Sequence, residues 1–278
     1  ALVISSNFYS GAIVYIYRNF LSQNSYINGA GIYFSNGGNH TVSNNIICNN
    51  KADSLGGAIF CNNSSPLFIN NTIVNNQSLK GGAIYCTAIS NPVFENCILW
   101  GNSANDGDQV YLYDEPSDPT FNYCDVEGGS AAFQTNTNAF YLGTYTNNLD
   151  GDPNFLNPTS ASGVNYSSLP VDWSLIPGSL CVDGGNPSGN YTGTDILGNP
   201  RVSYGVVDIG AIEYLNTGII EMDSNYGVNI NPNPSTGDFN LLNARYTIVD
   251  IEIYSTDGKR VFKKQKHPTS QTLSTNLN

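Results

Sequence analysis

The chain has 278 residues, only 12% of them charged, and its 10 basic and 22 acidic side chains give a formal net charge of −12. Nucleic acids and anionic membrane surfaces repel such a protein, and no basic run reverses the sign locally. No stretch of the sequence approaches the roughly 20 apolar residues that a membrane-spanning helix needs. The composition therefore favours a β-rich extracellular protein and argues against nucleic acid as a partner.

A repeat of 26 residues organises the first half of the chain. Residues 40–52, 66–78 and 92–104 align without a gap, and the same register extends back to residues 18–24. Self-similarity at a fixed period of this length is typical of solenoid proteins, in which each repeat stacks on its neighbours. Three columns of equivalent positions follow: Asn24, Asn50, Asn76 and Asn102; Leu21, Ile47, Ile73 and Leu99; Ile16, Val42, Phe68 and Phe94.

A glycine-rich unit that leads into Ile or Val and an aromatic residue recurs between these blocks, at residues 29–33, 56–60, 81–85 and, in degenerate form, 107–111. The flanking runs are short, β-branched or aromatic, and bounded by Gly, Asn and Pro, which predicts two or three short strands in each period. Leucine-rich spacing and helical periodicity are both absent. We therefore predict stacked coils whose strands pair in parallel, about 4.8 Å apart, around a continuous apolar column.

Each coil should turn at the glycine pair, because glycine adopts positive φ without steric cost. We place a second bend at Asn44, Asn70 and Asn96, where stacked side-chain amides can hydrogen-bond along the axis as an Asn ladder. Cys61 and Cys86 occupy equivalent positions in successive coils. We interpret them as buried, stacked thiols rather than a disulfide, since free cysteine packs as a small hydrophobe.

These repeats resemble the right-handed parallel β-helix of pectin-lyase-like and polymorphic outer-membrane proteins, in which Gly-Gly-Ala-Ile units and Asn-rich turns recur. The resemblance covers residues 8–130 and implies an all-β fold whose coils occupy residues 1–130. Because the chain opens on a strand-like stretch without Met or a signal peptide, we expect an N-terminus that is cut within a domain or processed. It implies no particular activity, because this fold carries lyases, hydrolases, adhesins and inert spacers.

From residue 131 the repeat register is lost, and turn-rich motifs follow up to residue 214. Their Asp-Gly and Pro-Gly steps predict turns. Together they resemble the choice-of-anchor Q segment that closes β-helices in bacterial surface proteins. This implies that residues 131–214 hold the last coils and cover the exposed edge of the final coil. The motifs lie at residues 152–155, 172–179, 181–185, 195–201 and 207–213.

Residues 215–227 are predicted to form a linker, and residues 228–278 a separate module. Within it, residues 228–239 and 251–261 resemble the type A sorting domain of type IX secretion, a small β-sandwich of Bacteroidetes exports. The resemblance implies handling by the type IX secretion machinery and a location outside the cell or on the outer-membrane surface. Because the last strands of such domains have no counterpart here, we expect the sorting domain to be truncated.

Side chains suited to polysaccharide chemistry are sparse. A lyase needs a Lys or Arg base, and the repeats offer only Arg18, Lys51 and Lys80, which we interpret as solvated groups. A hydrolase needs two convergent carboxyl groups, but Asp106 and Asp108 are close only in sequence and are interpreted as surface acids. The other candidates, for which the sequence offers no catalytic partner, are Asp114, Glu115, Asp118, His40 and His267.

No motif requires a cofactor. Asp183, Asp195 and Asp208 recur beside glycine in the closing segment, and oxygen ligands of this kind can bind calcium. The alternative, which we favour, is that these carboxylates accept hydrogen bonds from the backbone in Asx turns.

An aromatic stripe is the most specific candidate for ligand binding. If Ile59 and Ile84 point inward, the residue after each points outward, because side chains alternate along a strand. One ring in each coil then forms a platform on which sugar rings or a partner protein can stack. A loop such as 113–120 can equally well cover the rings. The stripe consists of Tyr33, Phe60, Tyr85 and Tyr111.

The sequence thus favours a secreted, surface-displayed, non-catalytic β-helix that binds a glycan or another surface ligand as an adhesin does. Two alternatives stay open. One is a polysaccharide lyase or glycoside hydrolase whose active site lies in upstream coils, and the other is a structural spacer.

Overall fold

The computed structural model describes residues 1–5, 13–137, 140–166, 171–189, 191, 193–202 and 205–215, and four strands between residues 228 and 265. The chain divides into two compact units, Ala1–Leu215 and Asn216–Asn278. Within the described ranges the only helix is the 3-10 turn η1 (Ser130–Ala132). None of the described residues forms a helix long and apolar enough to span a membrane. Linker residues 216–227, most of the Asn-Pro-Asn-Pro run and His267 lie outside the described residues.

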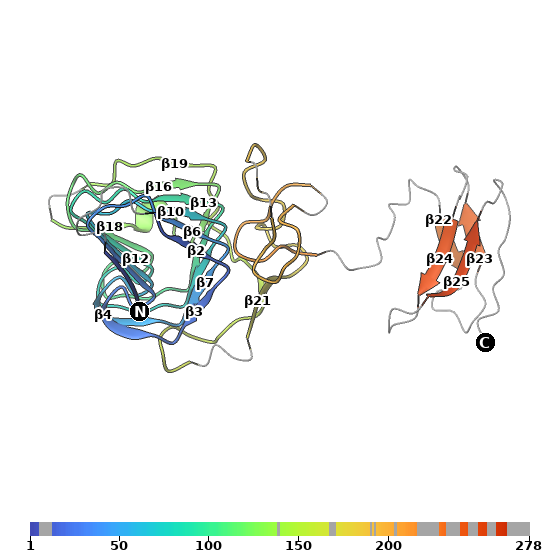
Figure 1. The fold of residues 1–278 in the computed structure, drawn as a ribbon, viewed down its shortest axis with the longest axis horizontal. Helices are drawn as coiled ribbons and strands as arrows, with labels where there is room; N and C mark the ends of the chain where they lie inside the picture. The colour runs from blue at the N-terminus through green and yellow to red at the C-terminus, as the bar shows by residue number, and fades with distance from the viewer. Residues whose placement is uncertain are drawn as a thin grey trace. The chain divides into compact units, whose positions relative to one another are not determined.

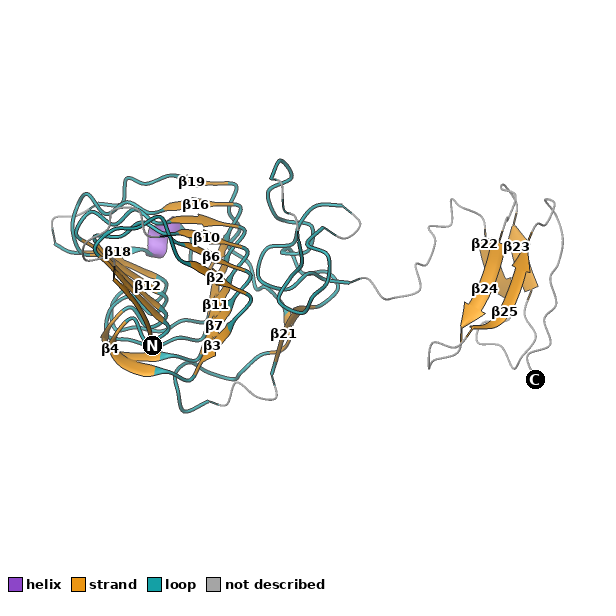
Figure 2. Cartoon of the chain, viewed as in Figure 1, coloured by secondary structure: helices purple, strands orange, loops and turns teal. Residues whose placement is uncertain are grey.

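The first unit is a right-handed parallel β-solenoid with three sheets along its length, in which each strand pairs with its equivalent in the next coil (Figures 1 and 2). The first sheet contains β1 (Leu2–Ser5), β5 (Ile32–Ser35), β9 (Ile59–Asn62), β12 (Ile84–Thr87), β15 (Val110–Leu112) and β18 (Gln134–Thr135). The second contains β2 (Tyr15–Tyr17), β6 (Thr41–Ser43), β10 (Leu67–Ile69), β13 (Val93–Glu95), β16 (Thr120–Asn122) and β19 (Tyr145–Thr146). The third contains β3 (Phe20–Ser22), β7 (Ile46–Cys48), β11 (Thr72–Val74), β14 (Ile98–Trp100) and β17 (Asp125–Val126). A short additional pair consists of β4 (Ser25–Asn28) and β8 (Lys51–Leu55).

Strand pairing confirms the 26-residue register. In the second sheet Phe68 pairs with Val42 on one side and Phe94 on the other. The Phe68 and Phe94 rings are fully buried and stack with centroids 4.5 Å apart. In the third sheet Ile73 lies between the equivalent residues of its neighbouring coils. The predicted apolar column therefore runs continuously inside the coils.

The paired glycines turn the chain into the first sheet, and the two have different roles. Gly81 adopts a φ of 67°, and a Cβ there would lie 2.3 Å from the carbonyl oxygen of Ile84. At Gly82 a Cβ would lie 2.3 Å from the carbonyl oxygen of Asp108 in the next coil. The first glycine is thus required by backbone conformation, and the second by the close approach of successive coils.

Each coil also contains left-handed corners, and at two of them asparagine recurs. Asn44, Asn70 and Asn96 form the corner between the second and third sheets, with φ between 50° and 54°. Asn49 and Asn75 form the corner after the third sheet, with φ of 54° and 55°. Asparagine tolerates this conformation better than most residues, which explains why the corners repeat as Asn.

The predicted ladder at Asn44, Asn70 and Asn96 requires a correction. Only one amide bond joins these side chains, from Asn96 Nδ2 to Asn70 Oδ1 at 3.0 Å. The buried Asn44 Oδ1 has no hydrogen-bond partner among the described residues, and Asn96 Oδ1 accepts the N–H of Asn186 in the closing segment. Because the left-handed corner redirects the chain, the residue that follows it is the one that enters the coil interior and forms the ladder.

Two continuous ladders are therefore formed by the residues that directly follow the left-handed corners. Asn50 Nδ2 donates to Asn76 Oδ1 at 2.9 Å, and Asn76 Nδ2 donates to Asn102 Oδ1 at 2.9 Å. Asn76 Nδ2 also reaches the carbonyl oxygen of Ile47 at 2.9 Å, so the amide bonds both along the axis and to a strand. The ladders comprise Asn24, Asn50, Asn76 and Asn102, and Asn19, Asn45, Asn71, Cys97, Cys124 and Asn148.

All six cysteines are buried and free. Cys61 and Cys86 occupy paired positions of β9 and β12, which confirms their interpretation as stacked thiols. Hydrogen bonding between them, together with burial, raises the pKa of Cys86, so the unreactive thiol form persists.

The closing segment packs beside the solenoid along the third sheet, whereas we predicted a cover over the final coil (Figure 1). A second apolar core forms there between Trp173 and Ile209 of the closing segment and Val74 and Ile98 of the sheet. The cause is the apolar outer face of the third sheet, which needs a cover along its length. The closing segment contains the antiparallel pair β20 (Phe155–Asn157) and β21 (Asp172–Leu175).

In the second unit, β22 (Val228–Asn231) pairs antiparallel with β23 (Asn240–Asn243). β24 (Asp250–Tyr254) pairs antiparallel with β25 (Arg260–Gln265). The described part of this unit is thus all-β.

Candidate functional site

The four aromatic residues of the predicted stripe form a stacked column along the first sheet. Adjacent ring centroids are 4.9, 5.4 and 5.3 Å apart, and the ring planes differ by 20° or less. Tyr33 is half-buried, but Phe60, Tyr85 and Tyr111 are only 5%, 4% and 4% exposed. The rings recur once per coil, but three of the four are buried, and Tyr113 of the 113–120 loop packs on the column, in keeping with the alternative of a covered stripe.

The physical reason is that neighbouring rings cover each other's faces. Leu55 packs against the column, and Tyr113 stacks on Tyr85 at 6.3 Å. Lys80 Nζ lies 4.5 Å from the ring centroid of Tyr111 and donates to its hydroxyl oxygen at 3.0 Å. The face contacts that sugar stacking would use are already made within the protein, where they help to align successive coils.

Lys80 is not placed to act as a general base. Its hydrogen bond to Tyr111 raises the pKa of its ammonium group, and Asp106, at 3.7 Å, acts in the same direction. A general base must be deprotonated near the working pH, and this lysine holds its proton more firmly than usual. Arg18 donates to the carbonyl oxygen of a closing-segment residue, and Lys51 begins β8.

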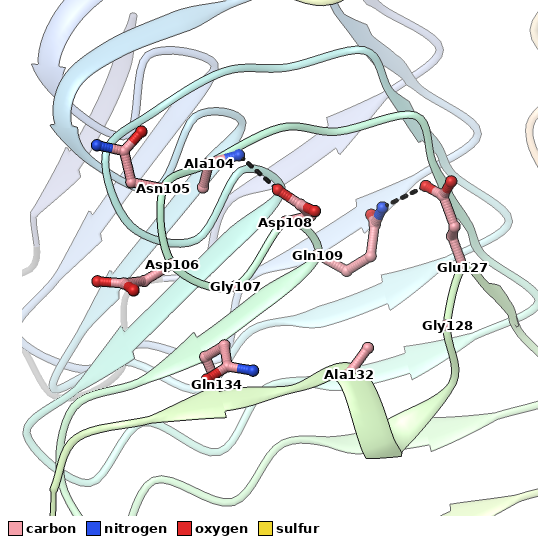
Figure 3. Close-up of a pocket in the computed structure, with 10 residues that line it drawn as sticks. All are labelled: Ala104, Asn105, Asp106, Gly107, Asp108, Gln109, Glu127, Gly128, Ala132 and Gln134. Atoms are coloured by element: carbon pink, nitrogen blue, oxygen red, sulfur yellow. Dashed lines mark hydrogen bonds between the residues drawn. The ribbon is translucent and has the colours of Figure 1, made fainter.

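An acidic pocket of about 560 Å³ lies at the degenerate glycine turn (Figure 3). Asp106, Asp108 and Glu127 line it together with Gln109. Asp108 Oδ1 accepts a backbone N–H at 2.7 Å, and Glu127 Oε2 accepts the side-chain N–H of Gln109 at 2.8 Å. Figure 3 shows the Asp106 carboxylate directed away from the other two. The three groups thus bond to the coil and do not converge as a hydrolytic pair would.

The neighbouring acids stabilise turns. Asp114 accepts the backbone N–H of Ala88 and two hydroxyl groups, and Asp118 Oδ1 accepts a backbone N–H at 2.7 Å. Glu115 is exposed. His40 is buried, with Nε2 3.1 Å from a backbone carbonyl oxygen. Each of these groups therefore has a structural explanation or faces solvent.

The three aspartates considered for calcium bind the backbone instead. Asp195 accepts the N–H groups of Leu197 and Asn199 at 2.9 and 2.8 Å. Asp208 Oδ1 accepts the N–H of Asp183 at 2.7 Å. No group of three His, Cys, Asp or Glu residues that could hold a metal ion is present in the described part of the chain. The contacts of Asp195 are those of an Asx turn, whereas Asp208 bonds to the backbone of a residue distant in the sequence.

The closing segment also buries an arginine among its acids. Arg201 is 1% exposed, donates Nη2 to the backbone oxygens of Asp208 and Gly210 at 3.0 and 3.1 Å, and lies 3.8 Å from Glu213 Oε1. Burial raises the pKa of Glu213 to about 8 and that of Asp208 to about 6. This cluster couples the fold of the closing segment to pH.

A second pocket, which we call the aromatic pocket, has a volume of about 320 Å³ and lies between the third sheet and the closing segment. Trp100, at the end of β14, and Phe155, in β20, supply half-buried walls. Trp173 packs edge-on against Phe155 with centroids 5.2 Å apart. The exposed side chains of Asp152 and Asn154 also line the pocket. Aromatic surface with a few polar groups is the usual make-up of a small-ligand site.

Sequence reasoning missed this pocket, although the repeat carries a signal for it. Trp100 pairs with Val74, and a large aromatic ring thus replaces a small apolar side chain at this position. The next position changes from Asn75 to Gly101. Two consecutive departures from a regular repeat mark the coil that lines the pocket.

Comparison with known proteins gives two matches. The family model of the right-handed beta helix region matches residues 2–150, more than half of the chain. The model of the secretion system C-terminal sorting domain matches residues 229–278. No curated protein and no solved structure shows significant similarity to the chain.

Proposed function

Because the chain belongs to the right-handed beta helix family and carries a type IX secretion sorting domain, it is a secreted bacterial protein of the cell surface or its surroundings, and we propose that it acts as a non-catalytic adhesin. In this role the solenoid holds a glycan or another surface ligand, and the sorting domain directs export. The resemblance of residues 150–214 to a choice-of-anchor segment stays a prediction within this proposal.

One observation supports a binding role over a catalytic one: the polar side chains near the acidic pocket are hydrogen-bonded or ion-paired within the protein. Lys80 is paired with Tyr111 and Asp106, and its pKa is raised. Glu127 accepts hydrogen bonds from Gln109 and from the backbone. Groups that a lyase or hydrolase would keep available for substrate are here bonded to the protein itself.

The test uses the full chain attached to beads and incubated with immobilised plant, algal and bacterial polysaccharides. An adhesin retains the beads on at least one surface and releases neither reducing ends nor unsaturated products. Product release from any polysaccharide would assign the protein to the enzymes of this fold. The acidic pocket would then be the first place to substitute, starting with Glu127→Gln.

A spacer role is the second candidate, and the buried aromatic column favours it. Phe60 and Tyr85 stack between neighbouring rings and contribute to coil alignment rather than to an open surface. A pure spacer retains no beads on any glycan or cell surface. The same adhesion assay therefore separates the two roles.

A further inference from the structure

The aromatic pocket lies where one position of the repeat changes from asparagine to glycine. In the two preceding coils, the corner residues Asn49 and Asn75 reach the closing segment, and their Nδ2 groups donate to its carbonyl oxygens at 3.1 and 3.0 Å. The equivalent residue of the next coil is Gly101, with a φ of 64°. The side chain of Asn75 lies over this glycine, where a Cβ would meet its Oδ1, and both residues line the pocket beside Trp100.

Trp100 offers this space an aromatic surface. Its ring is half-buried and, among the described residues, makes no ring–ring contact. The rings of the buried column differ, because each of them stacks on a neighbour. Trp100 packs against the apolar core beside the third sheet, and the half-buried ring presents part of its aromatic surface to the pocket, where a ligand can stack.

Among the polar groups of the pocket, Asp152 and Asn154 supply hydrogen-bond acceptors, whereas the buried indole Nε1–H of Trp173 is a donor. Asp152 Oδ1 accepts the N–H of Asn154 at 2.9 Å, and Asn154 Nδ2 donates to the carbonyl oxygen of Asp152 at 3.1 Å. Within the described residues, no hydrogen bond uses Asp152 Oδ2 or Asn154 Oδ1. The hydroxyl of Thr159 already donates to Asn49 and accepts from Asn75. A ligand that satisfies this pocket must therefore bring donors.

The charge and the volume of the pocket restrict the class of ligand further. Asp152 lines the pocket, Glu127 accepts the backbone N–H of Gly101 in the pocket wall, and the whole chain carries −12, so an anionic ligand is repelled. A volume of about 320 Å³ is at the lower end for ligand pockets, which suits one or two rings rather than an extended chain. A neutral sugar ring combines an apolar C–H face with several hydroxyl donors.

We propose that the aromatic pocket binds a neutral sugar ring, which stacks on Trp100 and donates hydroxyl hydrogen bonds to Asp152 and Asn154. This inference rests on the proposed adhesin role, to which it adds a site and a ligand class. The ligand is the terminal neutral sugar of a surface glycan, and uronic acids and sulfated sugars are excluded by the carboxylate.

The test starts with the full chain and the methyl glycosides of glucose, galactose, mannose and N-acetylglucosamine, with methyl glucuronide as the anionic comparison. Calorimetry and ligand-detected NMR report binding, and intrinsic fluorescence reports its place, because the chain has only two Trp and both line the pocket. We expect at least one neutral glycoside to bind and to change the tryptophan emission. Absence of binding by all four, or equal binding of the glucuronide, would overturn the proposal.

Variants then locate the site. Trp100→Ala should weaken binding about tenfold, the effect of losing one stacked ring, and Trp100→Phe should recover part of it. Tyr113→Ala removes a 50% exposed ring outside the pocket and should leave binding unchanged. Binding by Trp100→Ala at wild-type affinity would rule the pocket out.

Adhesion and sugar binding can fail separately. Beads that adhere equally with wild type and Trp100→Ala would refute the pocket as the adhesive site while the adhesin role stands. Sugar binding that depends on Trp100 without any adhesion would support the site and remove the adhesin role. Capture of apolar peptides in place of glycosides at this pocket would contradict the assigned ligand class.

Discussion

The side-chain oxygen of Asn76 accepts two hydrogen bonds from Asn50, one from its backbone N–H at 3.0 Å and one from Nδ2 at 2.9 Å. Asn76 makes the same pair of bonds to Asn102, from its N–H and Nδ2, each at 2.9 Å. The amides of Asn50 and Asn76 are therefore satisfied only when the coils on both sides are in place. The ladder joins neighbouring coils in a cooperative hydrogen-bonded network inside the solenoid.

Asn76→Ala should be strongly destabilising. It leaves the N–H and Nδ2 of Asn50 and the carbonyl oxygen of Ile47 without their partner in a buried site. One unsatisfied buried group costs about 1–3 kcal/mol, so we expect a loss of at least about 3 kcal/mol in the free energy of unfolding. Urea or thermal denaturation of the full chain measures it.

The matched control is Asn70→Gly at the adjacent corner. Asn70 has a φ of 54°, which glycine accepts without strain. Its side-chain oxygen accepts a single hydrogen bond from the neighbouring coil, donated by Asn96 Nδ2. The expected loss is about 1 kcal/mol. If Asn70→Gly proves as damaging as Asn76→Ala, the ladder is not where the structure places it.

Gly81→Ala should destabilise by steric conflict as well as by backbone strain, because the added Cβ would lie 2.3 Å from the carbonyl oxygen of Ile84. Gly178→Ala isolates the strain. Its φ is 89°, but a Cβ there meets no atom within 4 Å. The control should lose about 1–2 kcal/mol, and Gly81→Ala clearly more. Similar melting temperatures for the two variants would contradict a close turn at Gly81.

The closing segment should lose stability as pH rises. Burial raises the pKa of Glu213 from 4.5 to about 8 and that of Asp208 from 3.8 to about 6. A carboxyl group with a raised folded-state pKa stabilises the fold fully below its unfolded pKa and loses that contribution as pH rises through the folded pKa. We expect the free energy of unfolding to fall by on the order of 2 kcal/mol between pH 5 and 8.

Glu213→Gln tests the origin of this dependence, because glutamine resembles the protonated acid and cannot titrate. The variant should be close to wild type at pH 5 and should show a flatter pH profile up to pH 8. An unchanged slope would show that Glu213 is already ionised at pH 5 and paired with Arg201, which lies 3.8 Å away.

Phe60→Ala should affect stability and leave sugar binding intact. Its ring is 5% exposed and stacks between Tyr33 and Tyr85, so truncation should cost about 3 kcal/mol. Val93→Ala, at a side chain 37% exposed on the second sheet, is the control and should change the melting temperature little. Loss of glycoside affinity in folded Phe60→Ala would restore the aromatic column as a ligand platform.

The repeat by itself predicted the parallel solenoid, the strand register and the glycine turns. These features are local, or they recur at a fixed offset. Gly56 and Gly81 are therefore enough to predict the turns, and Phe68 and Phe94 are enough to predict the register. The same regularity predicted one aromatic ring per coil in the first sheet.

Only the tertiary structure decided which residue of each Asn pair carries a ladder and which aromatic surface is open. The left-handed corner at Asn70 directs Asn71 into the coil, and that direction depends on backbone geometry rather than on residue type. The rings of Phe60 and Tyr85 are buried by one another, whereas Trp100 meets residues of the closing segment more than fifty positions away. The burial of a side chain results from contacts between segments that are distant in the sequence, and the repeat pattern does not predict those contacts.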